Sequence, residues 1–223
     1  FTNATLRDVN GWNSAHKING QAKFINTNTI EVNDQAYSAK SFIIAVGSTP
    51  NYEVTWKKEI GNKLITSDEI FELKSLPKSI AVIGSGVIAI ELAQAMQRLG
   101  VETTVFARSR KVGVLSSPKL QQIAQTELSK ELNIKFEILP NSVKNTENGV
   151  ELNYIENNET KQLFVEYLLA ATGRQSNLKT LNLENIDPSF SDLKKLPVNN
   201  ETKQLANLPI FIIGDAFTQT PLQ

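Results

Sequence analysis

The stretch IGSGVIAIE, residues 83–91, joins two segments of different hydrophobic pattern. Before it, SIAVIGS (79–85) is a continuous apolar run, as in a strand that is buried on both faces. After it, VIAIELAQAMQRLG (87–100) carries apolar residues at helical spacing and ends at a glycine, a common helix stop. The stretch therefore predicts a strand, a tight turn and a helix in direct succession.

Small residues in this turn favour a nucleotide site. Gly84 permits the tight turn, and Gly86 lets backbone amides approach a pyrophosphate at the helix N-terminus, where the helix dipole favours an anion. Ala89 is small enough for the helix to pack closely on the strand. A turn with only a structural role is the alternative, but the strand-turn-helix context favours a dinucleotide.

The alternation continues beyond this helix. ETTVFA (102–107) predicts a second strand, residues 117–133 a second helix, and IKFEIL (134–139) a third strand. Strand, helix, strand, helix, strand is half of a doubly wound fold. The predicted fold class is therefore α/β, with a Rossmann-like doubly wound parallel sheet.

Other segments predict antiparallel structure. Short strands at 21–26, 29–33, 35–40 and 41–48 read as an antiparallel β-meander, the last being apolar enough for burial on both faces. ITSDEIFEL (65–73) predicts a helix with a serine N-cap.

Towards the C-terminus, GVELNYIEN (149–157) and KQLFVEYLLAATG (161–173) predict an antiparallel insertion, and PIFIIGDAF (209–217) a further strand. Three apolar strands thus end at the glycines of AVGS, AATG and IIGD.

The end of the second strand indicates which dinucleotide is bound. An acidic side chain about 20 residues beyond the glycines hydrogen-bonds the ribose of NAD, whereas an arginine accommodates the phosphate of NADP. Here that place holds Ala107, followed by Arg108, Arg110 and Lys111, and residues 103–126 contain no carboxylate. A guanidinium matches phosphate oxygens bidentately, so the segment favours NADP over NAD; a solvated basic loop is the alternative.

Few other side chains stand out. Asp215 follows an apolar strand and is either a turn residue or an acceptor for sugar hydroxyls, and Glu91 is either a surface residue or a neighbour of the ligand. His16, the only histidine, is expected at the surface, and Trp12 and Trp56 in packing roles. No cluster has metal-ligand spacing, so we expect no metal site.

Composition restricts the partners. Lys plus Arg number 23 and Asp plus Glu number 23, so no global field attracts nucleic acid or an anionic membrane, and a small-molecule partner is expected. No stretch is apolar enough to span a bilayer and no apolar signal core opens the sequence, so we expect a soluble, cytoplasmic protein. The chain has 0 cysteines, which excludes thiol-disulfide chemistry by this chain alone.

Six motifs occur in order along the chain: AVGSTP (45–50), SDEIF (67–71), AVIGSGVIAIELA (81–93), AATGR (170–174), LPVN (196–199) and FIIGDAF (211–217). Together they resemble the flavin-dependent pyridine nucleotide-disulfide oxidoreductases, the family of dihydrolipoamide dehydrogenase and glutathione reductase. The arginine that follows the second strand is more similar to the glutathione reductase branch, which uses NADPH.

The resemblance implies roles for particular residues. Arg108 and Arg110 would hold the extra phosphate of NADP, Gly173 would lie against the dinucleotide, and Glu91 would lie near the nicotinamide and flavin rings. The pyrophosphate would lie on Gly84, Ser85, Gly86, Val87, Ile88 and Ala89.

The same resemblance implies FAD as a second cofactor. Gly47 and Ser48 would approach it, and Asp215 would hydrogen-bond its ribityl chain. In the family, hydride passes from NAD(P)H to the flavin and then to a cysteine pair.

The matched motifs correspond to the middle of such an enzyme. We expect residues 61–176 to form an NAD(P)-binding domain, and residues 1–60 and 177–223 incomplete segments of a flavin domain. The flavin motif with the cysteine pair, and the dimerisation domain with the catalytic histidine, are expected outside this chain. The chain alone would thus contain no catalytic residue, and the whole parent would be a homodimer. A non-catalytic dinucleotide-binding module and a purely structural α/β domain are the alternatives.

Overall fold

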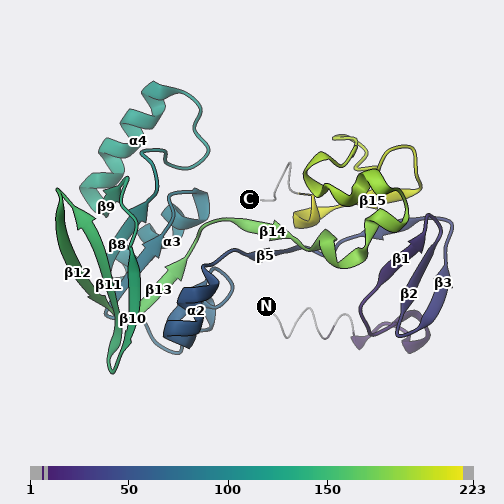
Figure 1. Ribbon diagram of the computed structural model, residues 1–223, viewed down its shortest axis with the longest axis horizontal. Coiled ribbons are helices and arrows are strands. Elements are labelled where there is room, and N and C mark those ends of the chain that lie inside the picture. The colour runs from purple at the N-terminus through teal and green to yellow at the C-terminus, as the bar shows by residue number, and fades with distance from the viewer. Residues whose placement is uncertain (1–6, 8–9, 218–223) are drawn as a thin grey trace. The chain divides into compact units, whose positions relative to one another are not determined.

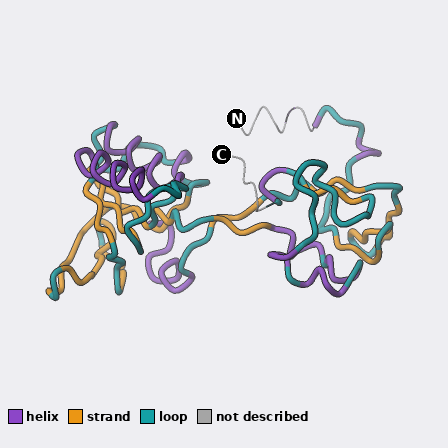
Figure 2. The backbone as a smooth tube through the Cα atoms, turned by 90° about the horizontal axis from the view of Figure 1, so that it is seen from above, coloured by secondary structure: helices purple, strands orange, loops and turns teal. Residues whose placement is uncertain are grey.

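The computed structural model describes residue 7 and residues 10–217 of the chain, which form two compact units. One unit comprises Phe1–Thr49 and Ser176–Gln223, and the other comprises Pro50–Gln175. The chain passes between them along β5 (Ser48–Pro50) and β14 (Arg174–Ser176), which form a two-stranded sheet (Figures 1 and 2). Residues 1–6, 8–9 and 218–223 of the expected flavin-domain segments lie outside the described residues.

A five-stranded sheet organises the unit Pro50–Gln175. Its strands run in the order β6-β13-β7-β8-β9, and every neighbouring pair is parallel. This arrangement confirms the predicted α/β fold with a parallel sheet. The strands are β6 (Leu64–Thr66), β7 (Ser79–Ile83), β8 (Glu102–Ala107), β9 (Asn133–Phe136) and β13 (Tyr167–Ala170), and the helices of this unit are α2 (Val54–Ile60), the short 3-10 helices η2 (Gly61–Lys63) and η3 (Ile70–Glu72), α3 (Val87–Arg98) and α4 (Pro118–Glu131).

The two faces of this sheet are covered by different elements. Side chains alternate across a strand, so Ile80 and Val82 of β7 pack in one cluster with the buried face of α3. Ala81 and Ile83 pack in another cluster with the buried side chains of a second, antiparallel sheet. The continuous apolar run of β7 is thereby buried on both faces, as expected of a parallel strand.

The second sheet comprises β10 (Ser142–Thr146), β11 (Gly149–Glu156) and β12 (Glu159–Val165), paired antiparallel in that order. The turn between β11 and β12 lies at Asn157 and Asn158, with φ values of 54° and 62° that suit asparagine. The antiparallel segment predicted over 161–173 is correct only in its first part. It divides at Glu166, whose amide donates to the carbonyl of Ser79, and the chain leaves the antiparallel sheet to form β13 of the parallel one.

The helix predicted over 65–73 is also wrong. Residues Leu64–Thr66 instead form β6 beside β13, and only Ile70–Glu72 adopt a short 3-10 helix, η3. The Glu69 carboxylate accepts hydrogen bonds from the amide of Thr66 at 2.7 Å and from its hydroxyl at 2.6 Å. These bonds resemble a capping box at the start of a helix, but the helical turn that follows extends only to η3.

The other unit contains three of the four strands predicted as an antiparallel β-meander, β1 (Lys23–Asn26), β2 (Thr29–Val32) and β3 (Gln35–Ser38), paired antiparallel in sequence order. The prediction is wrong for the fourth strand, 41–48, which does not join the meander. A parallel pair, β4 (Phe42–Ile44) and β15 (Ile210–Ile212), lies in the same unit. The expectation that β4 is buried on both faces is wrong, because Ile44 lies in the core but Ile43 is 71% exposed. Short 3-10 helices complete the unit: η1 (Ser14–His16), η4 (Asn177–Leu181), η5 (Leu183–Asn185), η6 (Pro188–Ser191), η7 (Leu193–Lys195) and η8 (Gly214–Ala216).

Candidate functional site

Gly84 occupies a position at the end of β7 that only glycine suits. Its φ is +128°, and a Cβ there would lie 2.3 Å from the carbonyl oxygen of Ala171. Its amide donates to the carbonyl of Phe106 at 2.9 Å. The turn therefore lies against the ends of β13 and β8, the strands on either side of β7, at the carboxyl edge of the sheet, where open α/β sheets bind ligands.

Gly86 is the N-cap of α3, with φ −70° and ψ 179°, and it makes no side-chain capping bond. A Cβ at Gly86 would meet nothing within 4 Å, so the space beside this residue is open. The first amides of a helix lack intrahelical partners, which here include those of Val87, Ile88 and Ala89. Ala89 itself is fully buried against the sheet. The helix start thus fits a bound anion.

Ser85 connects the glycine turn (residues 84–86) to the basic loop (residues 108–117), which follows β8. Its hydroxyl donates to the carbonyl of Lys111 at 2.7 Å, and its own carbonyl accepts from the amide of Gly113 at 2.7 Å. Gly113 has a φ of +58°, a conformation that favours glycine. The basic loop is therefore held beside the glycine turn.

Helix α4 fixes the same loop from its other side. The side-chain oxygen of Gln121 accepts from the amide of Val112 at 2.8 Å, and its nitrogen donates to the carbonyls of Val112 and Leu115. One turn further along, Gln125 donates to the carbonyl of Arg110. Two side chains at i and i+4 on one helix face thus hold the loop backbone.

The two arginines of this loop differ in their surroundings. Arg110 makes a long ion pair with Glu137, 3.9 Å between Nη1 and Oε2, and its guanidinium lies 5.4 Å from the ring centre of Phe136. Arg108 is exposed and, among the described residues, makes no side-chain hydrogen bond or ion pair. It lines an open hollow of about 340 Å³ together with Glu137. Both guanidinium groups are accessible to a phosphate.

Glu91 and Gly173 lie in the same unit. Glu91 is exposed on α3. Gly173 has a φ of +103°, and its carbonyl accepts from the amide of Asn51 at 2.9 Å. The hydroxyl of Thr172 donates to the carbonyl of Asn51 at 2.9 Å, so the chain after β13 is fastened to the segment after β5.

The residues expected to contact FAD lie together in the other unit. Gly47 has a φ of +66°, and its carbonyl accepts from the amide of Asn177 at 3.1 Å. The Ser48 hydroxyl lies 3.4 Å from a carboxylate oxygen of Asp215 and donates to it. Asp215 belongs to η8, the short 3-10 turn that follows β15. A serine from one strand end and a carboxylate from the neighbouring strand end could together bind sugar-like hydroxyls.

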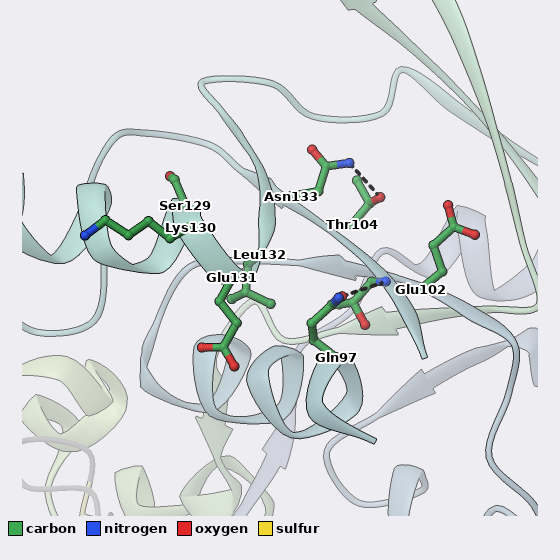
Figure 3. A pocket seen from close by; sticks show the side chains of 9 residues that line it. Gln97, Glu102, Thr104, Ser129, Lys130, Glu131, Leu132 and Asn133 are labelled. Carbon is green, nitrogen blue, oxygen red and sulfur yellow. Dashed lines mark hydrogen bonds between the residues drawn. The ribbon is translucent and has the colours of Figure 1, made fainter. Parts of the chain in front are cut away.

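A polar hollow of about 380 Å³ lies at the opposite edge of the sheet (Figure 3). Thr104 and Glu102 border it from the start of β8, and Asn133 donates to the hydroxyl of Thr104 at 3.2 Å. Ligands of open α/β sheets bind at the carboxyl ends of the strands, and this hollow adjoins the amino ends of β8 and β9. We therefore do not assign the dinucleotide to it.

Other expectations concern isolated side chains. His16 is exposed as expected, and Trp56 packs against the core between the two sheets of its unit. The packing role expected for Trp12 is wrong, since it is 63% exposed. Within the described part of the chain, no group of three or more His, Cys, Asp or Glu could hold a metal ion, and no helix is long and apolar enough to cross a membrane.

Three residues around the candidate site are not predicted from the sequence: Gln121, Gln125 and Glu137. The i, i+4 spacing of the two glutamines was a signal that could have indicated a common partner for α4. The position of Glu137 carried no comparable signal, because it depends on the register between β8 and β9.

The parallel sheet and its glycine turn place the chain in the Rossmann-like α/β class, with the antiparallel sheet β10–β12 packed on the second face of the parallel sheet. A family model described as pyridine nucleotide-disulphide oxidoreductase matches residues 6–223. The chain belongs to this family.

Similar proteins agree with this assignment. The chain is 35% identical over 201 residues to a mercuric reductase of Staphylococcus aureus, a match that covers 89% of this chain and 36% of the relative. It is 30% identical over 216 residues to a dihydrolipoyl dehydrogenase of the same organism, covering 94% and 45%. It is 31% identical over 213 residues to a glutathione reductase of Nostoc, covering 89% and 44%. The chain thus spans less than half the length of these relatives.

A solved structure shows the same fold. The HOCl-induced flavoprotein disulfide reductase RclA from Escherichia coli aligns with a TM-score of 0.73 at 22% identity. The alignment covers 98% of this chain and 51% of that one.

Proposed function

We propose that this chain is the nicotinamide dinucleotide-binding core of an FAD-dependent disulfide oxidoreductase, with a preference for NADP(H) over NAD(H). In the whole enzyme, such a core serves hydride transfer from NAD(P)H to FAD. Membership of the pyridine nucleotide-disulphide oxidoreductase family supports the reaction class. The preference for NADP(H) rests on the chain's own residues.

The observation that carries the proposal is the open helix start at Gly86. Gly86 places no side chain over the first amides of α3 and a Cβ there would meet nothing within 4 Å, while Gly84 lets the backbone turn against Ala171 without a clash. An anion there accepts from backbone amides and is favoured by the helix dipole. We assign the pyrophosphate to this position.

The preference for NADP follows from the end of β8. Ala107 ends the strand where an NAD site places a carboxylate, and Arg108 and Arg110 follow it. Charge-assisted bidentate bonds from guanidinium groups suit the 2′-phosphate of NADP. Ser85, Gln121 and Gln125 hold the loop that carries Arg110, which limits the entropy lost on binding.

We assign the domains accordingly. The NAD(P) domain is proposed as residues 61–176, and the flavin segments as 1–60 and 177–223. Helix α2, within the first of these flavin segments, lies in the unit Pro50–Gln175. The Ser48–Asp215 hydrogen bond supports a role for this pair in binding the FAD ribityl chain. A cytoplasmic location and a homodimeric parent belong to the same proposal.

A direct test is calorimetric titration of the purified chain with NADPH and NADH under identical conditions. The proposal expects binding of NADPH that is tighter than that of NADH. Equal affinity would contradict the NADP preference, and no heat with either cofactor would contradict the dinucleotide site itself.

One sequence feature favours a second candidate, a non-catalytic dinucleotide-binding module that reports nucleotide state to a partner. The chain holds 0 cysteines, so it cannot itself reduce a disulfide by thiol exchange. The reading frame around the gene segment separates the two candidates. A cysteine pair encoded upstream supports the oxidoreductase, and a natural start near Phe1 supports the module.

A further inference from the structure

We propose that Glu137 modulates cofactor specificity. Its carboxylate repels the 2′-phosphate and so weakens the preference for NADP(H) that Arg108 and Arg110 provide. This inference rests on the proposed function and adds a residue that acts against it.

The sheet register places Glu137 beside the basic loop. In the parallel pair β8–β9, Ala107 lies opposite Phe136, so the residues that follow them are Arg108 and Glu137. The amide of Ile138 donates to the carbonyl of Ala107 at 3.1 Å, which continues the association past the last paired residues. Glu137 is thus fixed next to the strand end that distinguishes NAD from NADP.

The backbone conformation of Glu137 is unusual. Its φ is +60°, in the left-handed region that residues other than glycine and asparagine rarely adopt. The chain bends at this point as it leaves β9. The bend leaves the side chain 64% exposed and places its carboxylate 3.9 Å from Nη1 of Arg110.

The carboxylate therefore acts on both arginines. It pairs with Arg110 and lines the same hollow as Arg108. A phosphate bound to these guanidinium groups comes close to the carboxylate and also competes with it for Arg110. Both effects weaken NADPH binding, whereas NADH, which lacks the phosphate, experiences neither.

The ion pair is weak enough to be replaced. Its partners are 62% and 64% exposed, and such surface pairs contribute little because water and salt screen them. Arg110 also lies against the ring of Phe136. The aliphatic part of the Arg110 side chain can stay packed on this ring when the guanidinium group turns towards a phosphate. Glu137 thus reduces affinity without closing the site.

The test compares the unaltered chain with Glu137→Gln, which removes the charge and keeps the side-chain size and the backbone requirement. Calorimetry gives the dissociation constants for NADPH and NADH. We expect the ratio of NADH to NADPH dissociation constants to rise about threefold to tenfold at low salt. The change should shrink strongly in 0.5 M salt, since the opposing charges are exposed.

Glu147→Gln is the matched control, because it removes the same charge from an exposed residue of the β10–β11 turn. Its ratio should equal that of the unaltered chain. Glu137→Lys should raise the ratio further than Glu137→Gln, and it provides a second measurement of the same effect. Far-ultraviolet circular dichroism verifies that each variant is folded.

The outcomes distinguish this inference from the proposed function. An unchanged ratio in both Glu137 variants, with NADPH binding intact, overturns the role of Glu137 alone. A raised ratio that persists in high salt also overturns it, because a local structural change would then be the cause. Failure of the unaltered chain to bind either cofactor overturns the proposed function and this inference with it.

Discussion

The hydroxyl of Ser85 donates to the backbone carbonyl of Lys111 at 2.7 Å, and this bond joins the glycine turn to the basic loop. The amide of Gly113 returns a bond to the Ser85 carbonyl, also at 2.7 Å. Two segments that approach different parts of a dinucleotide, the pyrophosphate and the ribose phosphate, are thereby held at a fixed separation. We therefore propose that the fixed conformation of this loop contributes to dinucleotide binding.

Ser85→Ala should therefore weaken NADPH binding without unfolding the chain. The loop loses one of its bonds to the glycine turn, and a neutral hydrogen bond contributes about 0.5–1.5 kcal/mol. We expect a loss of that size for NADPH and a smaller one for NADH, measured by calorimetry. Ser116→Ala, a change at an exposed serine further along the same loop, should leave both affinities unchanged. Equal effects of the two variants would contradict the role of Ser85.

Neutral replacement of Arg108 and Arg110 tests the phosphate contact itself. The lost charge-assisted bonds should cost NADPH affinity about 1–3 kcal/mol, with little change for NADH. Lys119→Ala removes one positive charge from the exposed start of α4 and controls for the general field. If NADPH and NADH lose affinity equally, the arginines do not contact the phosphate.

The fold could be predicted where the sequence pattern is local. β8 was predicted at its observed bounds, and α3 within two residues at its C-terminus, because their hydrophobic periods are unbroken and Gly100 ends the helix. The predictions that failed involve long-range pairing. Glu166 separates β12 from β13 and donates a backbone hydrogen bond to Ser79. No residue near Glu166 in the sequence predicts that the chain changes sheets there.

The candidate site divides in the same way. Gly84 and Gly86 were identified because a strand-turn-helix is a local pattern, and Arg108 because its distance from them is fixed. Glu137 was missed because its proximity to Arg110 arises from the pairing of β8 with β9, which are neighbours in the sheet but about thirty residues apart in the sequence.

A cluster in the unit Pro50–Gln175 should make stability depend on acid. Glu156 accepts hydrogen bonds from Lys135 and Lys161, each at 2.8 Å. The bond from Lys135 has the larger effect and that from Lys161 the next, and both lower the pKa of the Glu156 carboxyl. A lowered carboxyl pKa means that the stabilisation is present above the unfolded-state value, about 4.3, and is lost as the pH falls through the folded-state value.

Glu156→Gln should consequently reduce stability at pH 7 and leave a smaller further loss between pH 5 and pH 3 than the unaltered chain shows. Urea unfolding followed by circular dichroism at each pH measures this difference. Glu151→Gln, on the same strand, serves as the control, because among the described residues the Glu151 carboxylate accepts from Asn153 and Gln162 and forms no ion pair with a lysine. Parallel pH profiles for the unaltered chain and Glu156→Gln would show that the cluster does not act as described.

Gly84→Ala and Gly86→Ala should separate folding from binding. At Gly84 the added Cβ would lie 2.3 Å from the Ala171 carbonyl in a backbone of φ +128°, so the variant should lose about 2 kcal/mol or more of unfolding free energy. At Gly86 the φ is −70° and the space is open, so alanine fits and unfolding should change by no more than about 1 kcal/mol.

Gly86→Ala should weaken dinucleotide binding even though it changes stability little. A methyl group in the open space before α3 occupies the place proposed for the pyrophosphate, so NADPH and NADH should both lose affinity in a chain that remains folded. Thermal unfolding and calorimetry on the same samples measure the two effects. If Gly86→Ala binds both cofactors as the unaltered chain does, the pyrophosphate does not lie against the start of α3, and the glycine turn has only its structural role.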